Sequence, residues 1–134
     1  MSQDFPDGTV PRQARRFVRQ SEEAPAGCEL VHHDNETVCT VWGELDMSAL
    51  PMLEAAVEDH SFSRSVRLGL RRATFMDSVA IRWSLRLVAR GQRDGATVSM
   101  VVAPGGQPHR VLEVCGLSPL SAGRRRRFGL TRLP

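Results

Sequence analysis

Lysine and tyrosine are absent from this 134-residue sequence, and aromatic residues make up only 5% of it. All 18 basic residues are therefore arginine, a composition that we attribute mainly to a nucleotide bias of the source. With 15 acidic residues the formal net charge is +3. Arginine favours planar, bidentate contacts wherever it clusters. The scarcity of aromatic rings argues against a nucleic-acid surface built on base stacking.

Long apolar runs are also missing. No stretch approaches the roughly 18 consecutive apolar residues that a membrane span needs, so we expect no membrane partner. The first residues, MSQDFPDGTV, lack the basic-then-apolar order of a secretory signal, which predicts a cytoplasmic protein. Hydrophobic residues at 41% and charged residues at 25% are typical of a globular chain. The length predicts one domain with short additions.

Cysteine is scarce and widely spaced. Cys28, Cys39 and Cys115 form no C-x-x-C pair, which argues against a structural zinc site. In a cytoplasmic chain they should stay reduced. His32 and His33 are neighbours, so on a strand they point to opposite faces and cannot hold one metal together. We therefore expect neither a metal nor a cofactor.

The chain divides into three parts by composition. Residues 1–26 are punctuated by proline and glycine and crowded with charges, which predicts a flexible N-terminal tail. Residues 27–120 carry the regular apolar patterns of a globular domain. Residues 121–134 are arginine-rich and weakly patterned, which indicates a C-terminal tail.

Strand and helix patterns alternate within the globular part. Strands at 28–33 and 37–42 flank an Asp34-Asn35 turn and predict a hairpin. For a helix near 79–90, the spacing predicts a buried face of Ile81, Leu85 and Val88. The other predicted elements are a helix near 49–59, a strand at 65–70 with 71–76 as continuation or exit, a strand at 96–103 and a helix at 108–115. The order predicts an α/β fold, with a mixed sheet of about four to five strands and helices mainly on one face.

Three motifs stand where these elements meet. G-E-L-D at 43–46 ends a strand, T-F-M-D-S at 74–78 joins a strand to a helix, and V-L-E-V-C-G-L at 111–117 closes a helix. In this order they resemble the STAS domain of bacterial anti-sigma-factor antagonists, or anti-anti-sigma factors, over roughly residues 28–120.

The resemblance implies a cytoplasmic binding protein in transcription regulation rather than an enzyme. Such antagonists bind an anti-sigma factor that has serine kinase activity, and that binding releases a sigma factor. The kinase uses ATP to phosphorylate a serine directly after the aspartate of the F-M-D-S stretch, the phosphoprotein no longer binds, and a phosphatase resets it. On this chain the serine corresponds to Ser78, with Asp77 before it and Asp46 in the G-E-L-D motif.

The chemistry of Ser78 fits that role. A hydroxyl at the exposed start of a helix is reachable by a kinase, and phosphorylation adds about −1.5 to −2 charges. The helix N-terminus tolerates this charge, so the fold is expected to survive phosphorylation. The added charge instead weakens binding to the partner, and the switch requires no conformational change. The competing interpretation is that Asp77 and Ser78 are an ordinary helix cap and that Asp46 is a turn residue.

The sequence departs from the family pattern just after this serine. The usual continuation is D-S-[S/T]-G-[L/I]-G, whereas this chain has V-A-I-R-W at 79–83. Either a dedicated kinase partner contacts Arg82 and Trp83, or phosphorylation is lost and the protein binds constitutively. Trp83 has an equally good alternative as a packing residue. The loop at 104–108 also departs from the usual S-P-x-V-x-R. The expected partner-binding residues are Asp46, Asp77, Ser78, Val79, Arg82 and Trp83.

Three other functions remain open at this stage. A hydrolase with Ser78 as nucleophile and His109 as base would need flanking glycines that are missing. A nucleic-acid-binding protein would use the four arginines at 124–127, although a solubilising tail is the favoured interpretation. A STAS module that is not phosphorylated could also serve another signalling or transport assembly.

Overall fold

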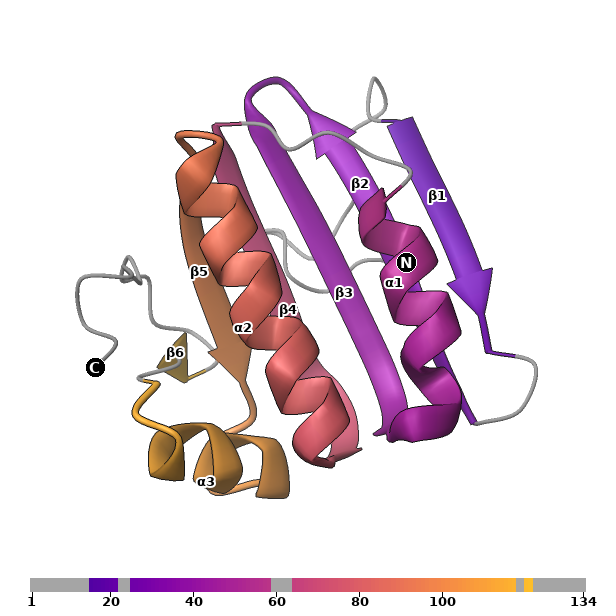
Figure 1. Cartoon of the computed structure of the whole chain (residues 1–134). Helices are drawn as coiled ribbons and strands as arrows, with labels where there is room; N and C mark the ends of the chain where they lie inside the picture. Colours follow the sequence, from indigo (N-terminus) through magenta and orange to yellow (C-terminus); the bar gives the residue numbers. More distant parts are fainter. Residues whose placement is uncertain (1–14, 22–24, 59–63, 118–119, 122–134) are drawn as a thin grey trace.

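The computed structural model describes residues 15–21, 25–58, 64–117 and 120–121. Within these residues one sheet carries six strands in the order β1-β2-β3-β4-β5-β6 (Figure 1). The strands are β1 (Arg15–Gln20), β2 (Ala26–His33), β3 (Glu36–Leu45), β4 (Ser65–Met76), β5 (Thr97–Val102) and β6 (Leu120–Ser121). The helices are η1 (Met47–Ala49), α1 (Leu50–Glu58), α2 (Ser78–Arg93) and α3 (Gln107–Val114).

The sheet is mixed, as predicted. β1, β2 and β3 pair antiparallel, and β3 through β6 pair parallel. Helices α1 and α2 lie side by side on one face of the sheet, and α3 lies near the ends of β5 and β6 (Figure 1). This confirms the α/β class with helices mainly on one face. The six described strands exceed the four to five predicted.

The β2–β3 hairpin forms where the sequence predicts it. Leu30 pairs with Cys39 and His33 with Glu36, and the connection is the Asp34-Asn35 turn. Asp34 has a φ of 52°, a left-handed conformation that aspartate tolerates better than most residues. The hairpin places the β-branched run of β3 in the middle of the sheet.

Strand β1 corrects the prediction of a flexible tail over residues 1–26. Residues 15–20 pair with β2 along their whole length, and β2 itself begins at Ala26. All six residues of β1 are exposed, so the strand has no alternation of buried and exposed positions that a sequence pattern could reveal. The Arg16 guanidinium forms an ion pair with the buried Glu29 carboxylate of β2, which helps to hold this edge strand in place.

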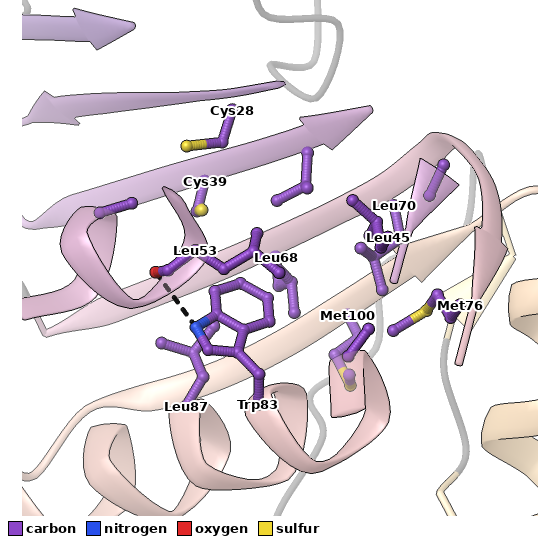
Figure 2. Close-up of a cluster of buried hydrophobic side chains, with 14 of the residues drawn as sticks. Cys28, Cys39, Leu45, Leu53, Leu68, Leu70, Met76, Trp83, Leu87 and Met100 are labelled. Carbon is purple, nitrogen blue, oxygen red and sulfur yellow. Dashed lines mark hydrogen bonds between the residues drawn. The ribbon is translucent and has the colours of Figure 1, made fainter. Parts of the chain in front are cut away.

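The core lies between the sheet and the two helices that cover it. Alternate residues of β5 and of the first half of β4 point into it, and Leu45 and Leu53 close it from β3 and α1 (Figure 2). The alternating core residues are Val66, Leu68 and Leu70 of β4 and Val98, Met100 and Val102 of β5. Burial of this apolar surface is the main source of the fold's stability.

The buried face of helix α2 is only partly the one predicted, because Val88 lies in the core but Ile81 and Leu85 only pack against its margin. Trp83 and Leu87 are fully buried with Val88, whereas Ile81 and Leu85 are only partly buried. Val79, Trp83 and Leu87 form a second apolar row on this helix, so spacing alone did not separate the two faces. The structure favours the Trp83 row because α2 packs against α1 as well as the sheet: the Trp83 indole N–H donates to the Leu53 carbonyl of α1 at 3.2 Å (Figure 2).

Strand β4 runs on past the end of its neighbour. Its last pair with β5 is Leu70–Val102, and among the described strands residues 71–76 pair only with β3. The stretch after Leu70 is therefore a continuation of the strand rather than an exit from it. This longer strand brings the C-terminal end of β4 close to the start of α2.

Candidate functional site

The ends of β3 and β4 meet at one edge of the sheet. Leu45 and Met76 are the last residues of the two strands and are paired in register. Asp46 directly follows β3 and Asp77 directly follows β4. The parallel pairing therefore brings the G-E-L-D and T-F-M-D-S motifs together. The Asp77 N–H donates to the Leu45 carbonyl at 3.1 Å and extends the ladder by one bond.

Asp77 binds backbone groups from two segments. Its Oδ1 accepts from the N–H groups of Val79 at 2.9 Å and Ala80 at 3.0 Å, which caps the start of α2. Its Oδ2 accepts from the N–H of Met47 at 3.1 Å. The carboxylate therefore fixes the start of α2 against η1.

Asp46 makes its own short-range contacts. Its Oδ1 accepts from the N–H of Ser48 at 2.9 Å and from the Ser48 hydroxyl at 2.6 Å. The hydrogen bond from the Ser48 side chain is the main reason that the pKa of Asp46 lies below its ordinary value. Asp46 is thus an ionised cap of η1, as the turn interpretation predicted. It directly precedes Met47, the first residue of η1.

Ser78 is the first residue of α2, and its side chain is exposed. This placement confirms the predicted exposed start of a helix. Arg82 is also exposed, one helical turn further on, and Val79 is partly buried. Ala80, which stands where the family usually has glycine, is 1% exposed and packs into the core.

Met47 is a surface residue that the sequence analysis did not single out. Its side chain is 69% exposed. We define the Ser78 surface by six residues at this edge: Asp46, Met47, Asp77, Ser78, Val79 and Arg82. Phe75, 42% exposed, flanks this surface and is paired in register with the exposed Glu44.

Two predicted site residues lie elsewhere. Trp83 is 3% exposed and packs in the core, so its side chain offers no surface to a partner, and the expected partner-binding role is corrected to a packing role. His109 accepts a hydrogen bond from the Gly105 N–H at its Nδ1, and its Nε2 faces Glu113 at 3.5 Å. Both ring nitrogens are thus directed within α3 and its preceding loop, which disfavours His109 as a base for Ser78.

The terminal segments named in the sequence analysis are mostly outside the described residues. These are residues 1–14 and 122–134, including the arginines at 124–127. Among the residues that the structure does describe, no group of three or more histidine, cysteine or acidic side chains is arranged to hold a metal ion. No helix in the same residues has the length and apolar character required to cross a bilayer.

The fold and the site define a small α/β domain. Its Ser78 surface, at the ends of β3 and β4, combines charged groups, a serine hydroxyl and an exposed methionine. The family model described as "Mlab, STAS domain" matches residues 28–121. The chain therefore belongs to the STAS domain family, as the three motifs indicated.

Solved structures share the fold. One is an anti-sigma factor antagonist from Mycobacterium paratuberculosis, with a TM-score of 0.58 and 19% identity, covering 77% of this chain and 91% of that one. Another is the anti-sigma factor antagonist SpoIIAA in its unphosphorylated form, with a TM-score of 0.54 and 17% identity, covering 73% of this chain and 89% of that one. No curated protein gives a significant match.

Proposed function

We propose that this STAS domain is an anti-sigma-factor antagonist that binds a serine-kinase-type anti-sigma factor through the Ser78 surface. Binding releases a sigma factor. Phosphorylation of Ser78 by the bound kinase ends the interaction, and a phosphatase restores it. The observation that carries the proposal is the exposed Ser78 side chain at the first position of α2, directly after the helix-capping Asp77.

The local electrostatics favour a switch based on charge. Asp46, whose pKa is lowered, already contributes a negative charge to this edge, and Asp77 adds a second carboxylate. A phosphate on Ser78 adds about −1.5 to −2 charges to the same small surface. A partner that binds the unmodified surface would then have to strip water from the phosphate dianion or place its own acidic groups against it. Both cost binding free energy. A penalty of a few kcal/mol weakens binding by factors of hundreds.

The exposed Met47 supports a binding surface as well as a modification site. An apolar side chain between acidic groups offers a partner both buried area and charge complementarity. Arg82 adds a cation one turn from Ser78. The two solved structures described above bear the names of anti-sigma factor antagonists, which is consistent with the proposal.

Phosphate mapping tests the modification. The protein is incubated with ATP and a candidate anti-sigma-factor kinase from the same genome, and the phosphate is located by mass spectrometry. We expect one phosphate on Ser78, none on Ser78→Ala, and full phosphorylation of the control Thr74→Ala, which removes another exposed hydroxyl of the same strand end. Phosphate that persists in Ser78→Ala would place the modification elsewhere.

Binding measurements test the surface. Ser78→Ala should bind the anti-sigma factor as the unmodified protein does, and Ser78→Asp should bind poorly. Gln20→Glu, which adds the same charge on exposed β1, is the control and should bind normally. Equal binding by Ser78→Ala and Ser78→Asp would remove the charge switch and favour the alternative of a STAS module that is not phosphorylated.

A truncated protein tests the nucleic-acid alternative. Removing residues 122–134, which hold the four consecutive arginines, should leave the affinity for the anti-sigma factor unchanged. A nucleic-acid-binding protein would lose most of its affinity for DNA or RNA, with a marked salt dependence in the full-length chain.

A further inference from the structure

We infer that Gln107 is a positioning residue for Ser78, because its carboxamide holds the backbone of Met76 at the end of β4. Gln107 lies in the 104–108 stretch that departs from the family pattern and is the first residue of α3. The inference rests on the proposed function for its biological meaning, but the geometry and its first test do not depend on any partner.

The contact is a reciprocal pair of hydrogen bonds. The Met76 N–H donates to Gln107 Oε1 at 2.8 Å, and Gln107 Nε2 donates to the Met76 carbonyl at 2.9 Å. Both distances lie in the normal range for strong amide hydrogen bonds. A carboxamide that bonds both backbone groups of one residue acts as one rung of a β-ladder.

The position of Met76 explains why such a rung is needed. β5 ends at Val102 opposite Leu70, so it does not reach the end of β4. On its other side, the end of β4 is paired with β3 through the Leu45–Met76 pair. Buried backbone groups that lack a partner are costly, and Met76 is 1% exposed. The Gln107 side chain supplies what a longer β5 would have supplied.

Gln107 is itself held firmly. It begins α3, which is secured to the core by the fully buried Leu112 and by Leu117 just after the helix. The loop before it is closed by the Gly105 N–H to His109 bond at 2.9 Å and by the Gly106 N–H to Ala103 carbonyl bond at 3.2 Å. The carboxamide therefore connects a fixed helix to the strand end.

The connection leads directly to the proposed switch. Met76 precedes Asp77, which caps α2 and bonds Met47, and Ser78 follows. Because the two residues before Ser78 are both held, Met76 by Gln107 and Asp77 by its cap and Met47 bonds, the backbone at Ser78 has little freedom of direction. Gln107 thus determines how the hydroxyl is presented, although its own side chain lies two residues away along the strand.

Amide hydrogen exchange, read residue by residue by NMR, tests the positioning role without a partner. Gln107→Ala should speed exchange of the Val79 and Ala80 amides by about tenfold, the effect expected from losing hydrogen bonds of ordinary strength. Gln107→Glu keeps an acceptor for the Met76 N–H but sets an oxygen against the Met76 carbonyl in place of the donor, so it should also speed exchange of both amides. Gln92→Ala removes the same group at the far end of α2 and should change neither amide.

Two results would overturn the inference. One is faster exchange confined to α3 in Gln107→Ala, which would mean that the carboxamide only secures α3. The other is unchanged exchange everywhere in both Gln107 variants. A kinase assay then supplies the functional readout: Gln107→Ala should lower kcat for Ser78 phosphorylation about tenfold, with the Gln92→Ala control unchanged. If no kinase phosphorylates the unmodified protein, the proposed function fails while the exchange result still decides the role of Gln107.

Discussion

The Asp77 carboxylate accepts a 3.1 Å hydrogen bond from the backbone N–H of Met47, a residue 30 positions earlier in the chain. The other oxygen of the same carboxylate caps α2. One side chain therefore sets the relative position of an exposed methionine and an exposed serine. The contact joins the T-F-M-D-S motif to the residue that directly follows G-E-L-D, and these are two of the three motifs that indicated the family.

Substitutions of Asp77 should separate its two roles. Asp77→Ala removes the cap and should destabilise the protein by about 1 kcal/mol, measured by urea unfolding. Asp77→Asn retains one acceptor oxygen for the cap but presents an NH₂ group to the Met47 N–H. It should keep most of the stability while the Met47 amide exchanges faster. Equal stability of Asp77→Ala and the unmodified protein would contradict the capping role.

Arg82 should interact with a phosphate on Ser78. The two residues are exposed and four positions apart on α2, a spacing that places side chains side by side. A neighbouring guanidinium favours the dianion, so Arg82→Gln should raise the second pKa of the phosphoserine from its value in the unmodified chain. A ³¹P NMR titration around pH 6 measures this pKa. Arg86→Gln, which alters the Arg86–Glu54 pair further along α2, is the control. An unchanged pKa in Arg82→Gln would exclude the contact.

The glycine of the G-E-L-D motif has a structural role. Gly43 has a φ of 90°, and a Cβ built there would lie 2.0 Å from the Pro25 carbonyl oxygen. Gly43→Ala should therefore cost at least about 2 kcal/mol, from backbone strain together with the clash. Gly95 has a φ of 81° but nothing within 4 Å of the added Cβ, so Gly95→Ala measures the strain alone. Equal losses in urea unfolding would show that the close approach of Pro25 has no consequence.

Ser48 should set the titration of Asp46. Its side-chain hydrogen bond lowers the pKa of Asp46, so the ionised form is favoured in the folded state. A carboxyl group with a lowered pKa contributes stability above its unfolded pKa of about 3.9, and that contribution is lost as the pH falls through the folded pKa. Ser48→Ala should raise the pKa of Asp46 in a ¹³C NMR titration. Any stability difference between the two proteins should be present at pH 7 and vanish at low pH. A lower or unchanged pKa would contradict this cause.

The cysteines should differ sharply in reactivity. Burial raises the pKa of the Cys28 thiol to about 11, so almost none of it is thiolate at neutral pH. Cys39 is also buried, whereas Cys115 is exposed after α3. Iodoacetamide should label Cys115 in the folded protein and all three cysteines in urea, as read by intact mass. Rapid native labelling of Cys28 would mean that the β2 side of the core opens readily.

The parts of the fold with strong local patterns were predictable from the sequence. The Asp34-Asn35 turn between two strand patterns, the second rich in β-branched residues, defined the hairpin, and Asp77 followed by an apolar periodic segment defined the start of α2. Strand β1 was missed because all its residues are exposed and its partner is a strand across a loop. The buried face of α2 was predicted only in part, since Val88 is buried, because contact with α1 through Trp83 and Leu53 depends on tertiary structure.

The candidate site shows the same division. Ser78, Asp77 and Asp46 were found because they stand in short motifs. Met47 and Gln107 were not, because their roles arise from hydrogen bonds to residues 30 and 31 positions away. Such contacts depend on which strand ends are adjacent, and a single sequence does not encode that information locally.

The central claim is that phosphate on one hydroxyl ends partner binding. The most direct test is calorimetric titration of the anti-sigma factor with two purified forms of the protein, one unmodified and one phosphorylated only at Ser78. We expect the phosphorylated form to bind at least about a hundredfold more weakly, corresponding to a few kcal/mol. Equal affinities for the two forms would contradict the account.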